Sequence, residues 1–567
     1  WDGFDWSKFS VVRFGLSVPQ PDANVVTSDA YRATVMATGK INEYGYRRIG
    51  LVVNGEFDQR VGGNWSSGFY YAQRLLGLKS KLPPLLTFLK TRTAEEFVLQ
   101  KAVLEVWLKE HRPDALLISD REVPGMLIAL GYRVPHDIAL AGMTVWDIPG
   151  VDAGIDQHSQ AIGRTAAETL VKQLNVNERG EPRDPVRILI ESRWQDGKSL
   201  PPLAGRKIRF SARSEPRPLP WVSARKRVTL KEIADRIGVS KNTVSLALRG
   251  NSRISLATKE RIDATARELG YVADPILQRL AAYRRGDTST KLRGLIAWLN
   301  HWNEPKQLRS YHEFESYWRG AGLAARRLGY RLEEFIWPAS CPAQRAEQLL
   351  RERKVLGLLI PPHKPDLDWG DFDWSQFSLI RFGMSVQQVD SNLVTADHQR
   401  AILMAVRRIH AYGYERIALI YDANHDRSMG GNLFGGFTCA MNQAALKPGI
   451  PALDFNVQQF DENCGAQVLK EWMLAHRPQA IITTAPQVPV LLRKLGYRIP
   501  CDVAVAGTSV QDISVEAGID QRSHAIGQIA AEMLIKQISL NERGEPADPC
   551  RILVESRWRD GKSLPPR

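Results

Sequence analysis

The sequence has no run of 18 or more apolar residues, although 44% of its 567 residues are hydrophobic. A membrane-spanning helix needs about 20 such residues, so no segment is predicted to cross a bilayer. Catalytic motifs are also missing: there is no G-x-S-x-G, no phosphate-binding P-loop and no H-E-x-x-H. GAGLAA at 320–325 matches a dinucleotide-binding turn, but the preceding YHEFESYWR predicts a helix where that motif needs a strand. We therefore do not expect an enzyme.

Cysteine is scarce, and every cysteine lies in the second half of the chain. The five are Cys341, Cys439, Cys464, Cys501 and Cys550, with no C-x-x-C pair among them. A disulfide framework or a structural metal site would be expected to recur in the repeat described next, but Cys501 and Cys550 align there with His136 and Val186. The sequence therefore predicts free, buried thiols in a reducing cytoplasm, with no metal and no cofactor.

The sequence contains two copies of one domain-sized unit. Positions 174–202 agree with 538–566 at 22 of 29 residues, and WDGFDWSKFSVVRFG at 1–15 returns as WGDFDWSQFSLIRFG at 369–383. The period of roughly 365 residues is far longer than the 20 to 50 residues of solenoid repeats. The duplication therefore predicts two large globular copies.

The two copies are unequal, because residues 228–368 have no counterpart ahead of Trp1. We expect the gene to encode two complete copies of the longer unit in tandem. The alternative is that the first copy is a remnant whose half-lobe exposes an apolar sheet. A linker at 203–227, rich in Pro, Arg and Ser, is long enough for the two cores to pair as a single-chain pseudo-dimer.

The net charge of +14 is concentrated in one segment. Between Arg206 and Arg293 there are 21 Lys and Arg against 8 Asp and Glu, which leaves the rest of the chain nearly neutral. A basic linker explains part of this charge. The remainder is typical of a module that binds nucleic acid.

The segment from Val228 predicts a helix-turn-helix. Its apolar residues fall at helical spacing, Gly238 interrupts them, and Ser240 is placed to cap a second helix with Val244 and Leu248 on its inner face. A third helix, capped by Ser255, follows. A small helical bundle without DNA function could show the same spacing, but the basic context favours DNA binding.

The run VTLKEIADRIGVSKNTVSLALRG…ISLATKERIDATARELGY resembles the DNA-binding head of the lactose-repressor (LacI/GalR) family, in order and without gaps from Val228 to Tyr271. The resemblance implies a dimeric regulator that reads a near-palindromic operator. Its second helix would enter the major groove, and DPILQRL (274–280) would form a hinge helix in the minor groove.

The resemblance carries over to individual DNA contacts. Lys241 and Asn242 would read base edges, whereas Leu246, where many members carry Arg, could touch only a thymine methyl. In the hinge, Leu277 replaces the usual alanine and Leu280 takes the position that wedges a base step. The phosphate-positioning residues would be Ser240, Thr243 and Ser245.

After Arg293, short apolar strands alternate with amphipathic helices, a pattern typical of parallel sheets covered on both faces. It resembles the periplasmic-binding-protein-like core of the same family, with two α/β lobes that close on a small effector. The predicted organisation is a truncated effector domain at 1–202, a linker at 203–227, a head at 228–273, a hinge at 274–292 and a complete effector domain at 293–567.

Ligands of such sheets bind beyond the carboxyl ends of the strands. The candidate effector-binding residues there are Asn300, Trp302, Asp397, Thr483, Thr484, Ser509 and Gln521, with Thr508 and His363 beside them. Other interpretations stay open: Asp397 as a helix cap, Trp302 as core and His363 as a solvated loop residue. Leu433 stands where relatives carry an effector-binding Arg, so these residues do not support a sugar by analogy.

We interpret the chain as a sequence-specific DNA-binding transcriptional regulator, an effector-controlled dimeric repressor of the cytoplasm. Its partners would be double-stranded operator DNA, an unidentified small molecule with carbohydrate as one candidate, and a second core from a homodimer or from the same chain. The alternative is a small-molecule binding protein of transport or chemotaxis type. The head from Val228 to Leu280 argues against it, because a transport receptor does not need one.

Overall fold

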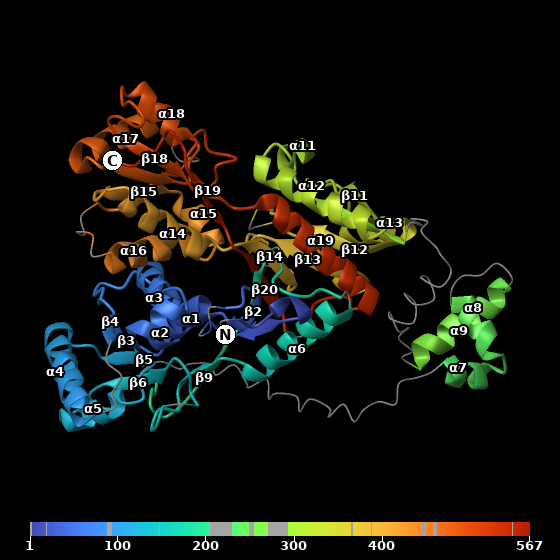
Figure 1. Cartoon of the computed structure of the whole chain (residues 1–567), viewed down its shortest axis with the longest axis horizontal. Coiled ribbons are helices and arrows are strands. Elements are labelled where there is room, and N and C mark those ends of the chain that lie inside the picture. The colour runs from blue at the N-terminus through green and yellow to red at the C-terminus, as the bar shows by residue number, and fades with distance from the viewer. Residues whose placement is uncertain are drawn as a thin grey trace. The chain divides into compact units, whose positions relative to one another are not determined.

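The computed structural model describes most of the chain (Figure 1). The described residues are 3–16, 18, 20–87, 93–146, 148–175, 177–182, 184–203, 230–248, 254–269, 293–364, 367–386, 388–444, 446, 450–456, 462–546 and 548–567. They form two compact units, one of Trp1–Arg206 with Lys291–Arg567 and one of Lys207–Thr290. The first unit holds both copies of the repeat, and the second holds the basic head.

The N-lobe of the second copy is a parallel sheet covered by helices, as the sequence pattern predicts. Its strands are β10 (Gly294–Asn300), β11 (Tyr330–Ile336), β12 (Val355–Ile360), β13 (Ser378–Phe382), β14 (Asn392–Ala396) and β20 (Cys550–Val554). Its helices are α11 (Pro305–Leu308), α12 (His312–Arg327), α13 (Ala343–Glu352) and α19 (Ser523–Leu540), with the 3-10 turn η2 (Trp374–Gln376). Gly320 and Gly527 allow α12 and α19 to pack closely, since a Cβ at either would stand about 2 Å from the carbonyl oxygen of His524 or Tyr317. This packing, rather than a dinucleotide, explains Gly320 of GAGLAA.

The C-lobe of the second copy is a six-stranded sheet in the order β16-β15-β17-β18-β19-β21. Only the last pair is antiparallel. The strands are β15 (Ile417–Tyr421), β16 (Leu453–Asp454), β17 (Ala480–Thr483), β18 (Ala504–Gly507), β19 (Gly518–Asp520) and β21 (Arg557–Arg559). The helices are α14 (His398–Ala411), α15 (Ala423–Ser428), α16 (Asn432–Gln443), α17 (Glu462–His476) and α18 (Gln487–Lys494).

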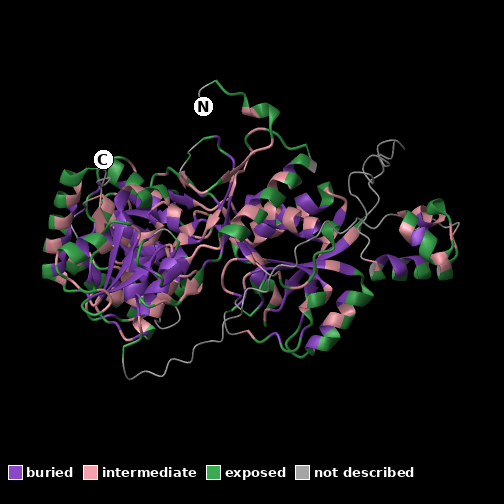
Figure 2. Ribbon diagram, turned by 90° about the horizontal axis from the view of Figure 1, so that it is seen from below, coloured by how far each residue is buried: buried purple, intermediate pink, exposed green. Residues whose placement is uncertain are grey.

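The first copy repeats the C-lobe with the same strand order, β4-β3-β5-β6-β7-β9. The strands are β3 (Ile49–Asn54), β4 (Leu85–Thr87), β5 (Ala115–Ile118), β6 (Ala139–Gly142), β7 (Gly154–Asp156) and β9 (Arg193–Gln195). The helices are α1 (Ala30–Glu43), α2 (Gly55–Arg60), α3 (Asn64–Leu75), α4 (Ala94–His111) and α5 (Val123–Ala129). Figure 2 shows buried residues concentrated along the sheets.

The two copies share one nine-stranded sheet. The first copy contributes β1 (Val12–Phe14), β2 (Asn24–Ser28) and β8 (Val186–Ile190). All neighbouring strands are parallel except β8 and β20, which meet antiparallel with Ile188 opposite Ile552. These two isoleucines are equivalent in the repeat, so a pseudo-two-fold axis passes between them. The sheet therefore joins the cores within one chain.

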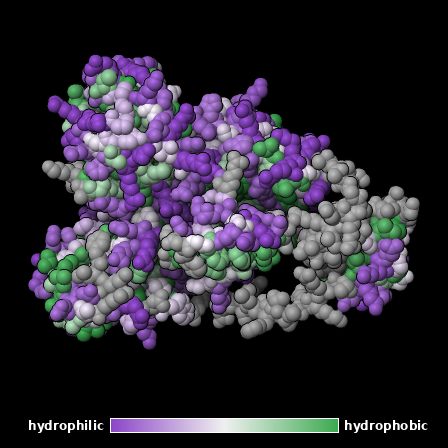
Figure 3. Space-filling view, viewed as in Figure 1, coloured by the Kyte–Doolittle hydropathy of each residue, from purple (hydrophilic) through white to green (hydrophobic). Residues whose placement is uncertain are grey.

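The part of the N-lobe described for the first copy leaves apolar surface open. Phe14 is 61% exposed, whereas its repeat counterpart Phe382 is fully buried. Helix α6 (Ser159–Asn175) corresponds to α19, yet a Cβ at its Gly163 would contact nothing within 4 Å. Val171 and Leu174 of α6 are also more than half exposed, and the surface over α6 includes hydrophobic side chains in Figure 3. The turn η1 (Trp6–Lys8) precedes β1.

The basic unit is a three-helix bundle of α7 (Leu230–Ile237), α8 (Lys241–Leu248) and α9 (Leu256–Glu268). Gly238 adopts a positive φ of +71° between α7 and α8, as the turn requires. The buried residues are Ile233, Ala234, Val244, Ala247, Ile262 and Ala266. The predicted helix-turn-helix is therefore confirmed. Residues 204–227 of the predicted linker (203–227) and the whole predicted hinge (274–292) lie outside the described residues.

None of the five cysteines forms a disulfide, but they are not all buried. Cys439 and Cys550 are buried, whereas Cys464 and Cys501 are exposed. The expectation of buried thiols is wrong for these two. Cys464 lies on the first turn of α17 and Cys501 lies in the connection between α18 and β18, and both positions are at the surface of the C-lobe. Among the described helices, none is both long and apolar enough to span a bilayer.

Candidate DNA-reading helix and effector cleft

The exposed start of α8 presents the residues expected to read DNA. Ser240 caps the helix, and its Oγ accepts a hydrogen bond from the Thr243 backbone N–H at 3.0 Å. Lys241 and Asn242 are exposed on the first turn, while Thr243, Ser245 and Leu246 are half-buried. Val244 and Ala247 anchor the opposite face in the bundle core. The helix therefore offers one short polar edge from a rigid support.

Two groups of residues predicted to bind effector lie in the second copy, one in each lobe. Thr483, Thr484, Thr508, Ser509 and Gln521 lie together at the carboxyl edge of the C-lobe sheet, where Thr508 N–H donates to Thr483 O at 3.0 Å. Trp302 and His363 lie at the corresponding edge of the N-lobe sheet, after β10 and β12. The chain order of strands accounts for this grouping, because parallel strands end at one edge.

Contacts between the lobes close this region at the start of α12. The His312 backbone N–H donates to Asp512 Oδ1 at 2.9 Å, and Ser316 Oγ donates to Gln511 Oε1 at 3.0 Å. Asp512 thereby takes the place of a cap on a helix whose own preceding residue, Tyr311, makes no side-chain cap bond. The contacts hold the lobes of the second copy together at the start of α12.

Glu313 is the unusual group between the two lobes. Its Oε1 is buried and has no hydrogen-bond partner among the described residues. Burial, followed by the nearby carboxylate of Asp512, raises the pKa of Glu313 to about 8, against a lowering by the Ser509 hydroxyl. At neutral pH Glu313 is therefore held largely protonated between the lobes.

An aromatic wall lines the N-lobe side. Trp302 Nε1–H donates to Pro362 O at 3.0 Å, and its ring centroid lies 6.0 Å from that of Tyr311 and 6.4 Å from that of His363. His363 is buried rather than solvated, so that expectation is wrong. Its Nε2 accepts from the His301 N–H at 3.0 Å, which leaves the proton on Nδ1 to bond Pro361 O. Burial lowers the pKa of His363 to about 4, so the ring stays neutral.

Several predicted effector residues already have structural partners. Asn300 Nδ2 donates to Pro305 O and Glu334 Oε1. Thr483 Oγ1 accepts from Ala485 N–H, and Thr484 Oγ1 accepts from Asp422 N–H. Ser509 Oγ donates to Asp512 Oδ2 at 3.3 Å, and Gln521 Nε2 donates to Thr508 O at 3.0 Å.

Asp397 lies away from the effector cleft. It caps α14 by accepting the Arg400 N–H at 3.2 Å, and its other oxygen pairs with Arg187 of the first copy. The helix-cap interpretation therefore describes its geometry. The ion pair adds a role in joining the copies.

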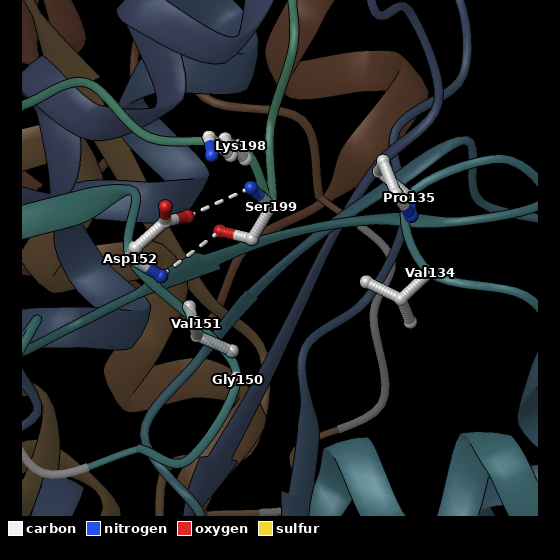
Figure 4. A pocket seen from close by; sticks show the side chains of 7 residues that line it. All are labelled: Val134, Pro135, Gly150, Val151, Asp152, Lys198 and Ser199. Carbon is white, nitrogen blue, oxygen red and sulfur yellow. Dashed lines mark hydrogen bonds between the residues drawn. The ribbon is translucent and has the colours of Figure 1, made fainter.

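A separate shallow pocket of about 380 Å³ lies in the C-lobe of the first copy, lined by Val134, Pro135, Gly150, Val151, Asp152, Lys198 and Ser199 (Figure 4). Asp152 Oδ1 accepts the Ser199 N–H, and the Asp152 N–H donates to Ser199 Oγ. These bonds tie the end of the copy to β7. The pocket's polar groups are thus engaged in holding the lobe together.

Comparison with known proteins assigns both units. Residues 229–274 match the family model for bacterial regulatory proteins of the lacI family, and residues 40–200 and 406–564 match that for the periplasmic binding protein-like domain. The chain belongs to the lacI family of bacterial regulatory proteins. It is a DNA-binding transcriptional regulator, with the periplasmic-binding-like core present twice.

Two curated relatives align over most of their own length, and a third aligns over a short stretch. The HTH-type transcriptional regulator CelR of Thermobifida fusca is 25% identical over 346 residues, 59% of this chain and 97% of the relative. The ribose operon repressor of Escherichia coli (strain K12) is 25% identical over 348 residues, 55% of this chain and 93% of the relative. The maltose regulon regulatory protein MalI of the same strain is 45% identical over 71 residues, 12% of this chain and 19% of the relative.

Sequence reasoning missed Glu313 and Asp512 of this lacI-family protein. Glu313 occupies the first turn of a helix, where acids are common for the helix dipole alone. Asp512 lies in a loop whose sequence, TSVQDIS, carries no recognised motif. Only their meeting across the lobes, 199 residues apart, distinguishes them.

Proposed function

We propose that this lacI-family regulator is a cytoplasmic repressor controlled by a small effector bound between the lobes of its second copy, with no reaction of its own to catalyse. The observation that carries the proposal is the bridging of the two lobes at the start of α12, through His312–Asp512 and Ser316–Gln511. If the lobe arrangement also sets DNA affinity, a ligand that prefers one arrangement shifts DNA affinity, and DNA shifts the affinity for the ligand by the same coupling free energy.

The effector is a small polar molecule, with a carbohydrate as the first candidate to test. Support comes from the aromatic pair Trp302 and Tyr311 beside the strand ends of the N-lobe, and from the hydroxyl and amide groups of Ser509 and Gln521 at the strand ends of the C-lobe. It also comes from the names of two relatives, a ribose operon repressor and a maltose regulon regulator. Aromatic faces and hydroxyl partners together suit an apolar sugar face and its polar rim.

On DNA, we propose that each head of residues 229–274 reads one half-site and that two chains occupy a near-palindromic operator. Lys241 and Asn242 would contact base edges, and Ser240, Thr243 and Ser245 would contact phosphates. The hinge residues Leu277 and Leu280 would insert in the minor groove, as the family resemblance implies. A transport-type receptor would not need these contacts.

The test starts from genomic DNA bound by the full chain, which is sequenced to identify the operator. Operator affinity is then measured with and without a panel of mono- and disaccharides. Trp302→Ala should abolish the response to the active sugar while leaving effector-free DNA affinity within about twofold. Trp146→Ala is the matched control, because Trp146 is 75% exposed in the first copy and should change neither property. Binding of sugar without any change in DNA affinity would refute effector control.

A further inference from the structure

The face that joins the copies is built from unequal residues at equivalent positions. NWSSGF of α3 (64–69) aligns with NLFGGF of α16 (432–437), so Ser67 and Gly435 are counterparts. They meet at the pseudo-two-fold axis, where a Cβ on Gly435 would stand 2.5 Å from Ser67 O and 2.9 Å from the Tyr31 hydroxyl. The axis has room for one side chain, and the first copy supplies it.

Around the axis, large residues of the first copy cover small residues of the second. The Tyr71 ring lies directly on the Gly431 backbone, since a Cβ there would stand 2.0 Å from the ring. At the equivalent contact on the other side, the smaller Cys439 lies against Gly63. The Arg74 guanidinium lies 4.2 Å from the centroid of the Phe434 ring. In the repeat, Arg74 and Phe434 correspond to Asn442 and Ser66, so this contact has no counterpart.

Polar contacts are also one-sided. Gln399 Nε2 donates to Gly62 O at 2.9 Å and to Ser67 Oγ at 3.0 Å. The counterpart of Gln399 is Tyr31, which fills the space beside Gly435 instead. The Gln399 amide therefore needs the serine that only the first copy carries at this position.

A symmetric pair of second copies would be underpacked. Gly435 would face Gly435, Cys439 would replace Tyr71 against Gly431, and Asn442 would replace Arg74 over Phe434. Each exchange removes atoms from a buried contact and leaves a cavity, and Gln399 loses a hydrogen-bond acceptor.

A symmetric pair of first copies would be overpacked at the axis. Ser67 would face Ser67. Each Ser67 Cβ would then enter the space that is open now because Gly435 has no side chain. The Tyr31 hydroxyl of each copy would also press on the Ser67 side chain of the other copy. Overpacking of this kind forces backbone shifts that destabilise the pair.

We propose that this face selects unlike copies, so that the first copy pairs with the second within one chain and two chains do not pair symmetrically through it. The same positions favour the unlike pair and disfavour both like pairs. They are three pairs of counterparts in the repeat: 67 and 435, 71 and 439, and 31 and 399. The two cores then act as a closed unit that carries a single described head. This inference concerns the cores alone and does not depend on the proposed effector or operator.

Thiol trapping in the full chain tests the pairing. Ile190 lies opposite Cys550 in the β8–β20 register, so Ile190→Cys should form a disulfide with Cys550 at the mass of one chain after mild oxidation. In a symmetric pair of second copies, by contrast, Cys550 of one chain would lie opposite Val554 of the other. Val554→Cys should therefore give no disulfide-linked chain dimer at twice 63.7 kDa. Both variants carry Ser in place of Cys341, Cys464 and Cys501, so that these thiols outside the junction cannot link two chains. A covalent dimer of either variant would then overturn the proposal, as would failure of folded Ile190→Cys to cross-link.

A second measurement guards against a failure of the cysteine variants to fold. Gly435→Ala should lower the Tm by roughly 2 to 10 °C, because its Cβ meets Ser67 O. Gly163→Ala, also within a helix but with nothing within 4 Å, should leave the Tm unchanged or raise it slightly. Equal behaviour of the two variants would show that the axis does not require glycine in the second copy.

Discussion

Arg187 of the first copy and Asp397 of the second form a buried ion pair across the junction of the two cores. Arg551 and Asp29 form the equivalent pair on the other side of the axis, and both aspartates also cap the helices that follow them. The junction thus repeats the same buried charge pairing twice, over and above the asymmetric contacts around Ser67 and Gly435.

Removing one partner of this pair should destabilise the joined cores. Asp397→Asn retains a side chain able to cap α14 but leaves the buried guanidinium of Arg187 without a counter-ion, which costs about 3–5 kcal/mol in comparable buried pairs. Denaturant unfolding followed by circular dichroism measures the change. Asp137→Asn is the control, because its partner Arg133 lies at an exposed surface, and it should change stability little. Similar losses in both variants would contradict a special role for the buried pair.

Glu313 should contribute a loss of stability as the pH rises from about 4.5 to about 8. Its pKa is raised in the folded protein, so between these values the folded state holds a proton that the unfolded state has released, and folding becomes less favourable with rising pH. Glu313→Gln should flatten this part of the pH profile and stabilise the protein at pH 8. A melting series from pH 4 to 9 on both proteins decides it, and an unchanged slope in the variant would exclude Glu313 as the source.

DNA binding should depend steeply on salt. With roughly six phosphate contacts, the logarithm of the binding constant should fall with the logarithm of salt concentration at a slope of about −5 or steeper. Titrations of labelled operator between low and physiological salt measure the slope. An affinity independent of salt would contradict binding through the basic segment.

Asn242→Ala should relax base preference at one position of each half-site, by roughly 1 to 3 kcal/mol, since the amide can bond an adenine edge through two hydrogen bonds. Ser245→Ala should instead weaken binding to all operator variants about equally, as expected of a phosphate contact. Titration against a set of single-base operator variants separates the two effects. Uniform weakening by Asn242→Ala would remove it from base reading.

Leu280→Ala tests the hinge, which lies outside the described residues. If Leu280 wedges a base step, the variant should bind more weakly and bend the operator less, while keeping the half-site preference set by Asn242. A bending assay beside the titration measures both properties. Parent-like bending and affinity would rule out the wedge.

Local pattern predicted the individual elements well. β10, β12, β15 and β18 coincide with short apolar runs, because strands buried on both faces need continuous hydrophobic sequence. The helix-turn-helix followed from the periodicity of Leu230 to Ile237, from Gly238 and from the cap at Ser240. The cleft was predicted less well: Trp302, Ser509 and Gln521 lie where the strand-end rule places them, but Asp397 lies at the copy junction and His363 is buried. Whether a side chain is buried, and which group it bonds, depends on residues that are distant in the sequence.

The sequence by itself determined that the chain contains two copies of an α/β core and a basic helical head, because repeats, periodicity, caps and charge are properties of neighbouring residues. Only the tertiary structure decided which edges meet. The pairing of β8 with β20, the ion pair of Arg187 with Asp397, and the meeting of Glu313 with Asp512 join residues about 200 to 360 positions apart. Their free energy arises from burial and close contact after folding, which no local pattern along the chain records.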